Sequence, residues 1–333
     1  MTLIVPVVAK PLEQINTPIE ALENVLEILP PWIQEHVRDH ADQVEDIIME
    51  VGRPLRFNLR HGFKRFAEIV SEDELKNLKF AFRDVAADNR TGIAGTLHRI
   101  AVRRRRARGG EGVIVGAIIR LARVTVGVAE PLRPFIDGSN LLLMGPPKSG
   151  KTTLLRDIVR IMAEQYGPRL VIVDTSNEIG GWSDVPHPII GDAVRLMVPG
   201  PEFQEKVITE AIANWSAEKI VLDEIKRLND ALALEEGSKT GVGFSATVHA
   251  QSLEEALERK AYAPLFGNVD LIARKKHTRV SFEKIIEIRS RGEYLVYEDA
   301  EAAITSHLEG QSLEGLGISV EAQTFTWKSG LKS

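Results

Sequence analysis

The spacing of hydrophobic positions changes near residue 140. Before that point, helical spacing alternates with short runs typical of strands. In residues 16–29, Thr17 and Glu20 occupy the positions of a capping box, and apolar residues at helical spacing follow. Residues 44–60 read as two strands joined by a turn at 52–54, which contains glycine and proline. These patterns predict a small α+β domain over residues 1–135.

Three further elements are expected in this N-terminal part. A short helix carries Trp32, Ile33 and Val37 on one side, and Ser71 with Glu74 forms a second capping box that opens a helix through about residue 85. Residues 93–128 favour strands on either side of the turn "RARGGEG".

From Asn140 onward, short apolar runs alternate with helical segments. The runs are "LLLM", "LVIVD", "IVLDEI" and "FSATVH", and the helices are expected at about 151–166, 201–216 and 228–236, with another capped by Ser252. This alternation is typical of an α/β domain with a parallel sheet and crossover helices. We therefore predict a RecA-like core over residues 139–290. A hairpin at 284–297 and a C-terminal strand with a loose tail over 291–333 complete the prediction.

Composition narrows the class of protein. A chain of 333 residues accommodates two domains, and a net charge of −5 with a pI near 6.0 argues against a protein coated in nucleic acid. The chain has no cysteine, which excludes disulfides, thiolate metal sites and a thiol nucleophile. No apolar run approaches the ~20 residues of a membrane span, and the N-terminus lacks the features of a signal peptide. The expected location is the cytoplasm.

A phosphate-binding loop lies between the run 141–144 and the helix that follows it. Residues 145–152 read "GPPKSGKT" and match G-x-x-x-x-G-K-[ST] in the strand-to-helix context that this motif needs. Glycines let the backbone wrap phosphates, and the helix N-terminus offers unpaired N–H groups. Lys151 would reach the β and γ oxygens, and Thr152 would bind Mg²⁺. The expected ATP-binding residues are Gly145, Pro146, Pro147, Lys148, Ser149, Gly150, Lys151, Thr152 and Thr153.

Hydrolysis of a nucleotide also needs carboxylates at the ends of neighbouring strands. Asp223 and Glu224 end the run "IVLDEI", so Asp223 is expected in the magnesium shell and Glu224 beside the attacking water. Glu178, which follows another strand end at Asp174, is the rival catalytic carboxylate, and the sequence does not rank the two. A lone histidine is most often a core residue, but His249 also ends a strand and is expected to sense the γ-phosphate.

With these motifs assembled, the chain resembles the stage III sporulation protein AA family of ATPases, and within it the cyanobacterial and chloroplast relatives. The resemblance rests on "DNRTGIAGTLHRI", "GPPKSGKTTLLRDI", "DTSNEIGGWSDVPHP", "IVLDEI" and "ATVHA", in this order, over roughly residues 20–260. It implies kinship with secretion and pilus-retraction ATPases. Those proteins usually work as hexameric rings, with an N-terminal domain stacked on a RecA-like core. A membrane-associated partner assembly, with the chain at its periphery, is expected for this protein as well.

The sequence departs from these relatives in three places. It reads "DEIKRLND" where they often have acidic residues after "DEIG", and "ATVHA" where they have "GTAHG". Many cyanobacterial relatives also bind single-stranded nucleic acid through a C-terminal arginine and histidine three residues apart. That motif does not occur in these 333 residues, which argues against a nucleic-acid role.

Arginines gather in residues 88–123. Nine arginines stand there against two acids, in a chain that is acidic overall. One interpretation is a solvated hairpin tip. A second is that Arg90, Arg99 or Arg195 reaches the nucleotide of a neighbouring subunit in trans. A third is contact with nucleic acid or anionic lipid through Arg103, Arg104, Arg105, Arg106 and Arg108, although the hairpin offers no aromatic side chain for base stacking.

Three functions follow from these patterns. The first is an ATP-hydrolysing ring motor, a homo-oligomer and by resemblance a hexamer, that uses ATP and Mg²⁺ to move domains on a partner assembly. The second is a nucleic-acid-binding protein or translocase driven by ATP. A metabolite kinase is weaker because no small-substrate motif occurs, and the lack of an N-K-x-D motif argues against GTP.

Overall fold

A computed structural model describes residues 22–78, 85–86, 89–105, 112–290, 292–311 and 317–321. These residues form two compact units. The N-terminal unit contains the described residues up to Thr125 together with the segment Asn177–Pro188. The P-loop unit contains Val126–Ser176 and the described residues from Ile189 onward. The chain therefore crosses between the units after Thr125, after Ser176 and after Pro188.

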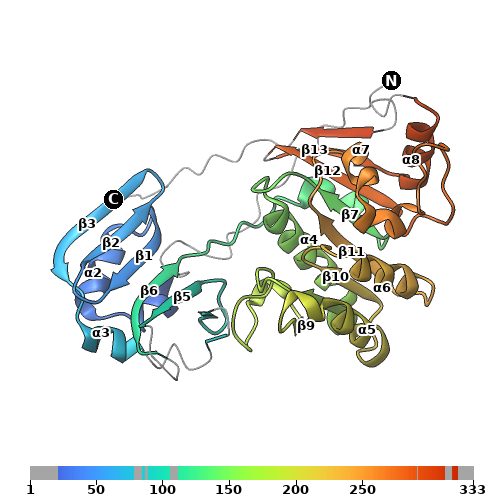
Figure 1. The fold of residues 1–333 in the computed structure, drawn as a ribbon. Helices are drawn as coiled ribbons and strands as arrows, with labels where there is room; N and C mark the ends of the chain where they lie inside the picture. The colour runs from blue at the N-terminus through green and yellow to red at the C-terminus, as the bar shows by residue number, and fades with distance from the viewer. Residues whose placement is uncertain are drawn as a thin grey trace. The chain divides into compact units, whose positions relative to one another are not determined.

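The N-terminal unit is built on a six-stranded antiparallel sheet with the order β3-β2-β1-β6-β5-β4 (Figure 1). Its strands are β1 Val44–Glu50, β2 Pro54–Leu59, β3 Gly62–Ile69, β4 Arg90–Gly92, β5 Arg99–Arg104 and β6 Ile114–Arg120. Its helices are α1 Glu23–Leu26, α2 Pro31–Asp39 and α3 Glu72–Asn77. The N-terminal unit is thus α+β.

The alternation of buried and exposed side chains along the strands shows which face of this sheet packs on the core. Ile47 and Met49 on β1 are fully buried and join the core that also contains Ile33 and Val37 of α2. On the other face, Ile118 of β6 remains 43% exposed. Side chains of a strand point alternately to the two faces, so a core on one face leaves the other open within this unit.

Several predicted elements of this unit are confirmed. The two strands joined at 52–54 are β1 and β2, the short helix is α2, and Ser71 with Glu74 forms the capping box of α3. The strand β3 was not predicted, because every residue of β3 except Phe66 is exposed and no apolar alternation marks it. The start of the helix at Thr17 lies outside the described residues, as do residues 79–84 of the expected longer helix.

The P-loop unit contains an eight-stranded sheet with the order β14-β13-β12-β7-β11-β10-β8-β9. Its strands are β7 Leu141–Met144, β8 Leu170–Asp174, β9 Val194–Met197, β10 Lys219–Leu222, β11 Gly243–Val248, β12 Lys284–Ser290, β13 Glu293–Tyr297 and β14 Gly317–Glu321. Its helices are α4 Lys151–Tyr166, α5 Gln204–Asn214, α6 Leu228–Ser238, α7 Leu253–Glu258 and α8 Ala300–Leu308.

The six strands from β12 to β9 in this order are parallel, and β13 and β14 extend the sheet antiparallel. Every residue of β7 and β8 is buried, as expected for strands with helices on both faces. Figure 1 shows helices covering this sheet. The strand β11 lies between β7 and β10, so the P-loop and the Asp223 strand end are separated by one strand. The predicted α/β fold is confirmed.

Most of the predicted helices of this unit are found in the structure, but the edge strand β9 and the helix α8 were not predicted. The predicted helix at 151–166 is α4, Ser252 caps α7, and the hairpin is β12 with β13. The helix expected at 201–216 instead begins as a 3₁₀ turn before α5 starts at Gln204. Residues 322–333 of the expected tail lie outside the described residues. Among the described helices, none has both the length and the apolar character needed to cross a membrane.

Candidate functional site

The P-loop connects the buried strand β7 to the start of α4. Gly150 lies directly before α4 with a φ of 98°, a conformation that residues with a Cβ rarely adopt. At Gly145, a Cβ would lie 2.9 Å from Ser149 Oγ and 3.0 Å from the carbonyl oxygen of Ile288. The backbone conformation therefore favours glycine at position 150, and the tight surroundings favour it at position 145.

Lys151 turns back into the loop that precedes it. Its Nζ donates hydrogen bonds to the carbonyl oxygens of Gly145, at 2.7 Å, and Pro146, at 2.8 Å. Burial lowers the pKa of this ammonium, and the nearby carboxylates Glu224 and Asp223 oppose that shift. The charge of Lys151 is thus held at the concave backbone of the loop, close to the acidic strand end.

The loop and its surroundings fit a magnesium nucleotide. Ser149 Oγ is buried without a hydrogen-bond partner among the described residues, which leaves a polar atom available to a ligand. Thr152 and Asp223 carry oxygen atoms of the kind that Mg²⁺ prefers as ligands. No cluster of three His, Cys, Asp or Glu in the described part of the chain could hold a metal by itself.

Two hydrogen bonds fix the end of β10 to the neighbouring strand β11. Thr247 Oγ1 donates to the backbone oxygen of Asp223 at 2.5 Å, and the backbone N–H of Ile225 donates to the oxygen of Thr247 at 2.9 Å. Asp223 is only 4% exposed. The Asp223 backbone is therefore hydrogen-bonded to β11 at the carboxyl edge of the sheet.

Glu224 lies between two basic side chains. Its carboxylate is 3.0 Å from His249 Nε2 and 2.9 Å from Lys226 Nζ. Burial lowers the pKa of His249; Glu224 opposes this shift, whereas Lys151, Lys226 and Arg259 add to it. The lowered pKa favours the neutral form of His249, and its buried Nδ1 has no hydrogen-bond partner within the described ranges.

Gln204 holds the backbone of Glu224 through a side-chain hydrogen bond. The sequence did not predict this contact. The Gln204 side chain is 1% exposed, its Nε2 donates to the backbone oxygen of Glu224 at 2.8 Å, and its Oε1 accepts from Thr175 Oγ1 at 2.6 Å. Gln204 thereby links the ends of β10 and β8. A glutamine at the start of an amphipathic helix carries no sequence signal for this role.

The two candidate catalytic carboxylates belong to different units. Glu224 lies in the P-loop unit with Lys151 and His249, whereas Glu178 lies in the segment 177–188 of the N-terminal unit. Asp174, at the end of β8, is fully buried in the P-loop unit. The structure thus groups Glu224, and not Glu178, with the P-loop within one compact unit.

The candidate trans arginines also belong to different units. Arg195 lies on β9, while Arg90 and Arg99 lie on β4 and β5 of the N-terminal unit. The guanidinium carbons of Arg90 and Arg99 are 5.7 Å and 6.0 Å from the centre of the Trp182 ring. Burial lowers the pKa of Arg99, and the neighbouring charges of Arg120 and Arg90 lower it further.

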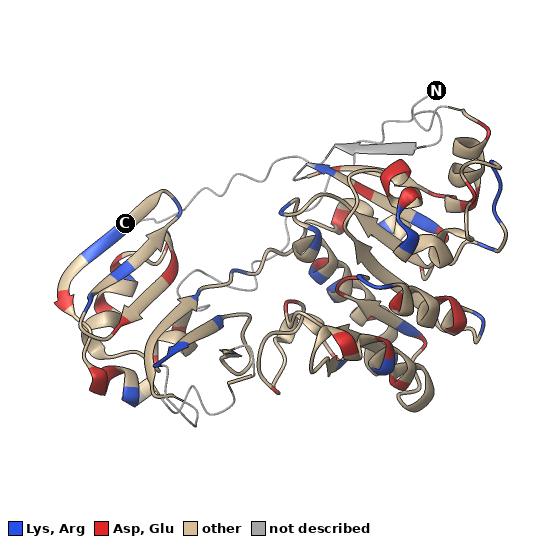
Figure 2. Ribbon diagram, viewed as in Figure 1, with Lys and Arg blue, Asp and Glu red and all other residues tan. Residues whose placement is uncertain are grey.

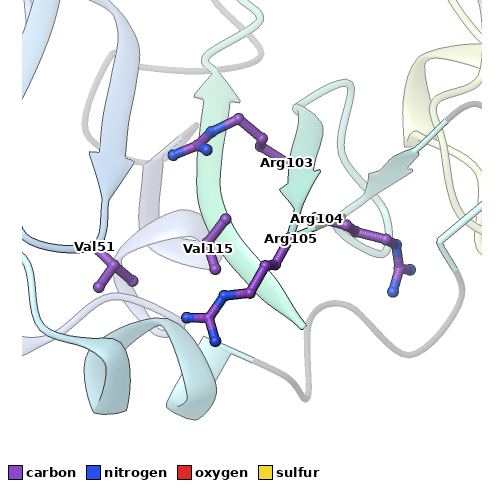
Figure 3. Close-up of a pocket in the computed structure, with 5 residues that line it drawn as sticks. All are labelled: Val51, Arg103, Arg104, Arg105 and Val115. Atoms are coloured by element: carbon purple, nitrogen blue, oxygen red, sulfur yellow. The ribbon is translucent and has the colours of Figure 1, made fainter. Parts of the chain in front are cut away.

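The arginines at the end of β5 line a hollow of about 650 Å³ (Figure 3). Its lining residues are Val51, Arg103, Arg104, Arg105 and Val115. Arg103 pairs with Glu50 at 3.0 Å, and Arg104 donates to Asn89 Oδ1 at 3.1 Å. Basic segments also occur on β2 and β3 (Figure 2). Arg106 and Arg108 lie outside the described residues.

A family profile and two relatives point to the same protein family. The profile described as "Sporulation stage III, protein AA" matches residues 64–287. The chain is 34% identical over 312 residues to the uncharacterized protein ycf45 of Porphyra purpurea, covering 87% of this chain and 54% of that protein. It is 33% identical over 315 residues to the protein SEEDLING PLASTID DEVELOPMENT 1 of Arabidopsis thaliana, covering 89% and 45%. The chain spans about half the length of these two relatives.

Two solved structures share the fold. The ATPase DotB of Legionella pneumophila superposes with a TM-score of 0.56 at 15% identity, covering 92% of this chain and 87% of that one. The pilus retraction motor PilT with bound ADP gives a TM-score of 0.51 at 13% identity, covering 78% and 77%. At these identities the likeness concerns the fold, which is that of RecA-like ATPases.

Proposed function

The chain belongs to the sporulation stage III protein AA family, and on that premise we propose that it is an ATP-hydrolysing ring motor of the secretion-ATPase type. The motor couples hydrolysis to domain movement on a partner assembly. One observation carries the proposal: Lys151, Asp223, Glu224 and His249 meet at the carboxyl edge of one parallel sheet. That edge is where ligands of open α/β sheets bind.

The side chains divide the work of ATP hydrolysis. Lys151 binds the β- and γ-phosphate oxygens, and Glu224 orients the attacking water. His249 donates a hydrogen bond from Nε2 to Glu224 and senses whether the γ-phosphate is present. Thr152 and Asp223 would hold Mg²⁺, which when bound neutralises charge that develops on the phosphates. Glu178 remains the rival for the role of Glu224.

The oligomer and the partner belong to the same proposal. Proteins that share the fold are named an ATPase and a pilus retraction motor with bound ADP, which supports ATP as the nucleotide. The secretion-type ATPases that the sequence resembles usually work as hexamers, and we extend that state to this chain. The proposed partner is a protein or a membrane-associated assembly.

Measurement of ATP hydrolysis by purified Lys151→Ala protein tests this function. Binding and turnover are expected to be lost, because the ammonium at the loop is removed from the β and γ oxygens. Lys239→Ala is the matched control, since Lys239 lies at the end of α6 and pairs with Glu236 on the surface. Wild-type turnover by Lys151→Ala, or none by the wild-type chain at any concentration, would overturn the proposal.

The hollow beside β5 favours one alternative, an ATP-dependent nucleic-acid-binding protein or translocase. Three consecutive arginines line it, and cations in such a cluster neutralise phosphates. Fluorescence anisotropy with labelled single-stranded DNA and RNA separates the two functions. A motor acting on protein shows no binding, whereas salt-dependent binding that Arg103→Ser, Arg104→Ser and Arg105→Ser weaken together would favour the alternative.

A further inference from the structure

The segment Asn177–Pro188 is inserted between β8 and β9 of the P-loop unit, but it packs in the N-terminal unit. The backbone N–H of Gly95 donates to the oxygen of Val185 at 3.0 Å. Within the segment, the N–H of His187 donates to the oxygen of Gly180 at 2.8 Å, and Ser183 Oγ donates to the oxygen of Val185 at 3.0 Å. The segment is therefore a closed loop fastened to the residues between β4 and β5.

Two glycines permit this close packing. A Cβ on Gly92 of β4 would lie 2.3 Å from Trp182 Cβ, and a Cβ on Gly181 would lie 2.2 Å from the carbonyl oxygen of Thr96. Gly181 also has a φ of 98°, which disfavours any other residue. Distances this short exclude a side chain at either position without displacement of the backbone. The fit between Trp182 and β4 is thus specific.

Trp182 also contacts the arginines of the N-terminal sheet. Its ring faces Arg90 and Arg99, at distances within the range of cation–π interactions. Arg99 is close to Glu178 as well, since that carboxylate opposes the lowering of the Arg99 pKa. The Trp182 ring therefore contacts both candidate trans arginines of this unit. Trp182 also lies four residues after Glu178, the rival catalytic carboxylate.

The other end of the segment is attached to the nucleotide site. Thr175 lies two residues before Asn177, and its hydroxyl is bonded to Gln204, which in turn bonds the backbone of Glu224. A displacement of the segment by the N-terminal unit would therefore act on the peptide that carries Glu224. The relay consists of two hydrogen bonds, of 2.6 Å and 2.8 Å, and a short covalent connection.

We propose that Trp182 is a positioning residue that ties the N-terminal unit to ATP turnover. Trp182 packs on Gly92 and contacts Arg90 and Arg99. It thereby fixes the segment 177–188 and sets the positions of Glu178 and the two arginines. Through Thr175 and Gln204 the same segment constrains Glu224. This inference rests on the proposed ATPase function and assigns to Trp182 a role in coupling rather than in nucleotide binding.

Steady-state kinetics of Trp182→Ala and Trp182→Phe test the role in turnover. We expect Trp182→Ala to lose about 10-fold or more in kcat, with ATP affinity and the number of binding sites unchanged, because misplacement by ~1 Å is enough for such losses. Trp182→Phe keeps a ring over the arginines and should recover most of the activity. The matched control is Trp215→Ala, which removes a tryptophan that is 40% exposed in the P-loop unit. Wild-type kcat in Trp182→Ala would overturn the proposal.

A second measurement judges the attachment of the segment without reference to hydrolysis. The chain has no cysteine, so a spin label at Asp184→Cys reports on this segment alone. The label should be immobile in the otherwise wild-type chain and mobile in Trp182→Ala and Gly92→Val. A label that is equally mobile in all three chains would refute the attachment. If wild-type protein shows no Lys151-dependent hydrolysis, the proposed function fails. The coupling to turnover then fails with it, whereas the attachment of the segment by Trp182 is still judged by the mobility of the label.

Discussion

His249 Nε2 lies 3.0 Å from Glu224 Oε1, across the carboxyl ends of the neighbouring strands β11 and β10. Burial lowers the pKa of the imidazole, which favours its neutral form beside the carboxylate. A γ-phosphate would compete for the same Nε2 proton. The pair is therefore suited to report the state of the nucleotide to the group that orients the water.

The first prediction separates the two carboxylates. Glu224→Gln should bind ATP normally and lose turnover by ~10²-fold or more, because the amide cannot accept a proton from water. Glu178→Gln should lose less. Single-turnover hydrolysis of radiolabelled ATP, with binding measured on the same samples, gives both values. If Glu178→Gln is the slower variant, the roles assigned to the two residues are reversed.

The second prediction concerns His249 and acid stability. Its folded-state pKa is lowered below the ordinary value of 6.5, so between these two values the unfolded chain binds a proton that the folded chain does not. Stability is therefore lost as pH falls from 6.5 through the lowered pKa. Urea unfolding at several pH values from 5 to 8 should show a shallower acid loss for His249→Asn. Identical pH dependence in both proteins would contradict the shifted pKa.

The third prediction concerns assembly. At least one of Arg90→Ala, Arg99→Ala and Arg195→Ala should bind ATP normally and hydrolyse it poorly. An arginine supplied in trans stabilises charge that develops only in the transition state, with effects of ~10³–10⁵ in rate. Mixing that variant with Lys151→Ala subunits should restore part of the activity, because these subunits still supply the arginine. Light scattering reports the mass of the mixed oligomer.

A monomer would give the opposite result in this experiment. Specific activity would not depend on protein concentration, and the mass with ATP and magnesium present would stay that of one chain. Mixing would restore nothing, since each site would depend only on its own arginines. That combination would replace the ring by a monomeric ATP switch.

The fourth prediction concerns a buried lysine at the start of β10. Lys219 is 1% exposed, and its Nζ donates to the carbonyl oxygens of Gly138 at 3.0 Å and Ser139 at 2.6 Å. Burial lowers its pKa from 10.5 to about 8. Between these values the unfolded chain binds the extra proton, so the stability of the wild type rises with pH from about 8 to 10.5.

Comparison with Lys219→Met isolates this contribution. The free energy of unfolding, measured with urea, should rise with pH in the wild type relative to Lys219→Met, by an amount of the order of 3 kcal/mol over the whole window. Lys206→Met, which changes an exposed lysine of α5, is the control and should follow the wild type. Parallel pH profiles of wild type and Lys219→Met would show that Lys219 titrates at its ordinary pKa.

The sequence by itself determined the elements that depend on interactions between residues close together in the chain. The P-loop could be placed because the motif demands glycine at fixed spacing between a buried strand and a helix, and α4 begins at Lys151 as expected. The capping box at Ser71 and Glu74 is also local, since its hydrogen bonds join residues three apart. Runs of consecutive apolar residues identified β7 and β8, because strands covered on both faces carry no polar alternation.

Only the tertiary structure decided which distant residues meet. Neither the Glu224–His249 pair nor the buried bridge by Gln204 follows from spacing, because strand order and register bring their partners together. The same is true of Glu178 and Trp182, whose segment follows a strand of one sheet and packs with the other. Long-range packing depends on the summed burial of many side chains, and no short stretch of sequence contains that sum.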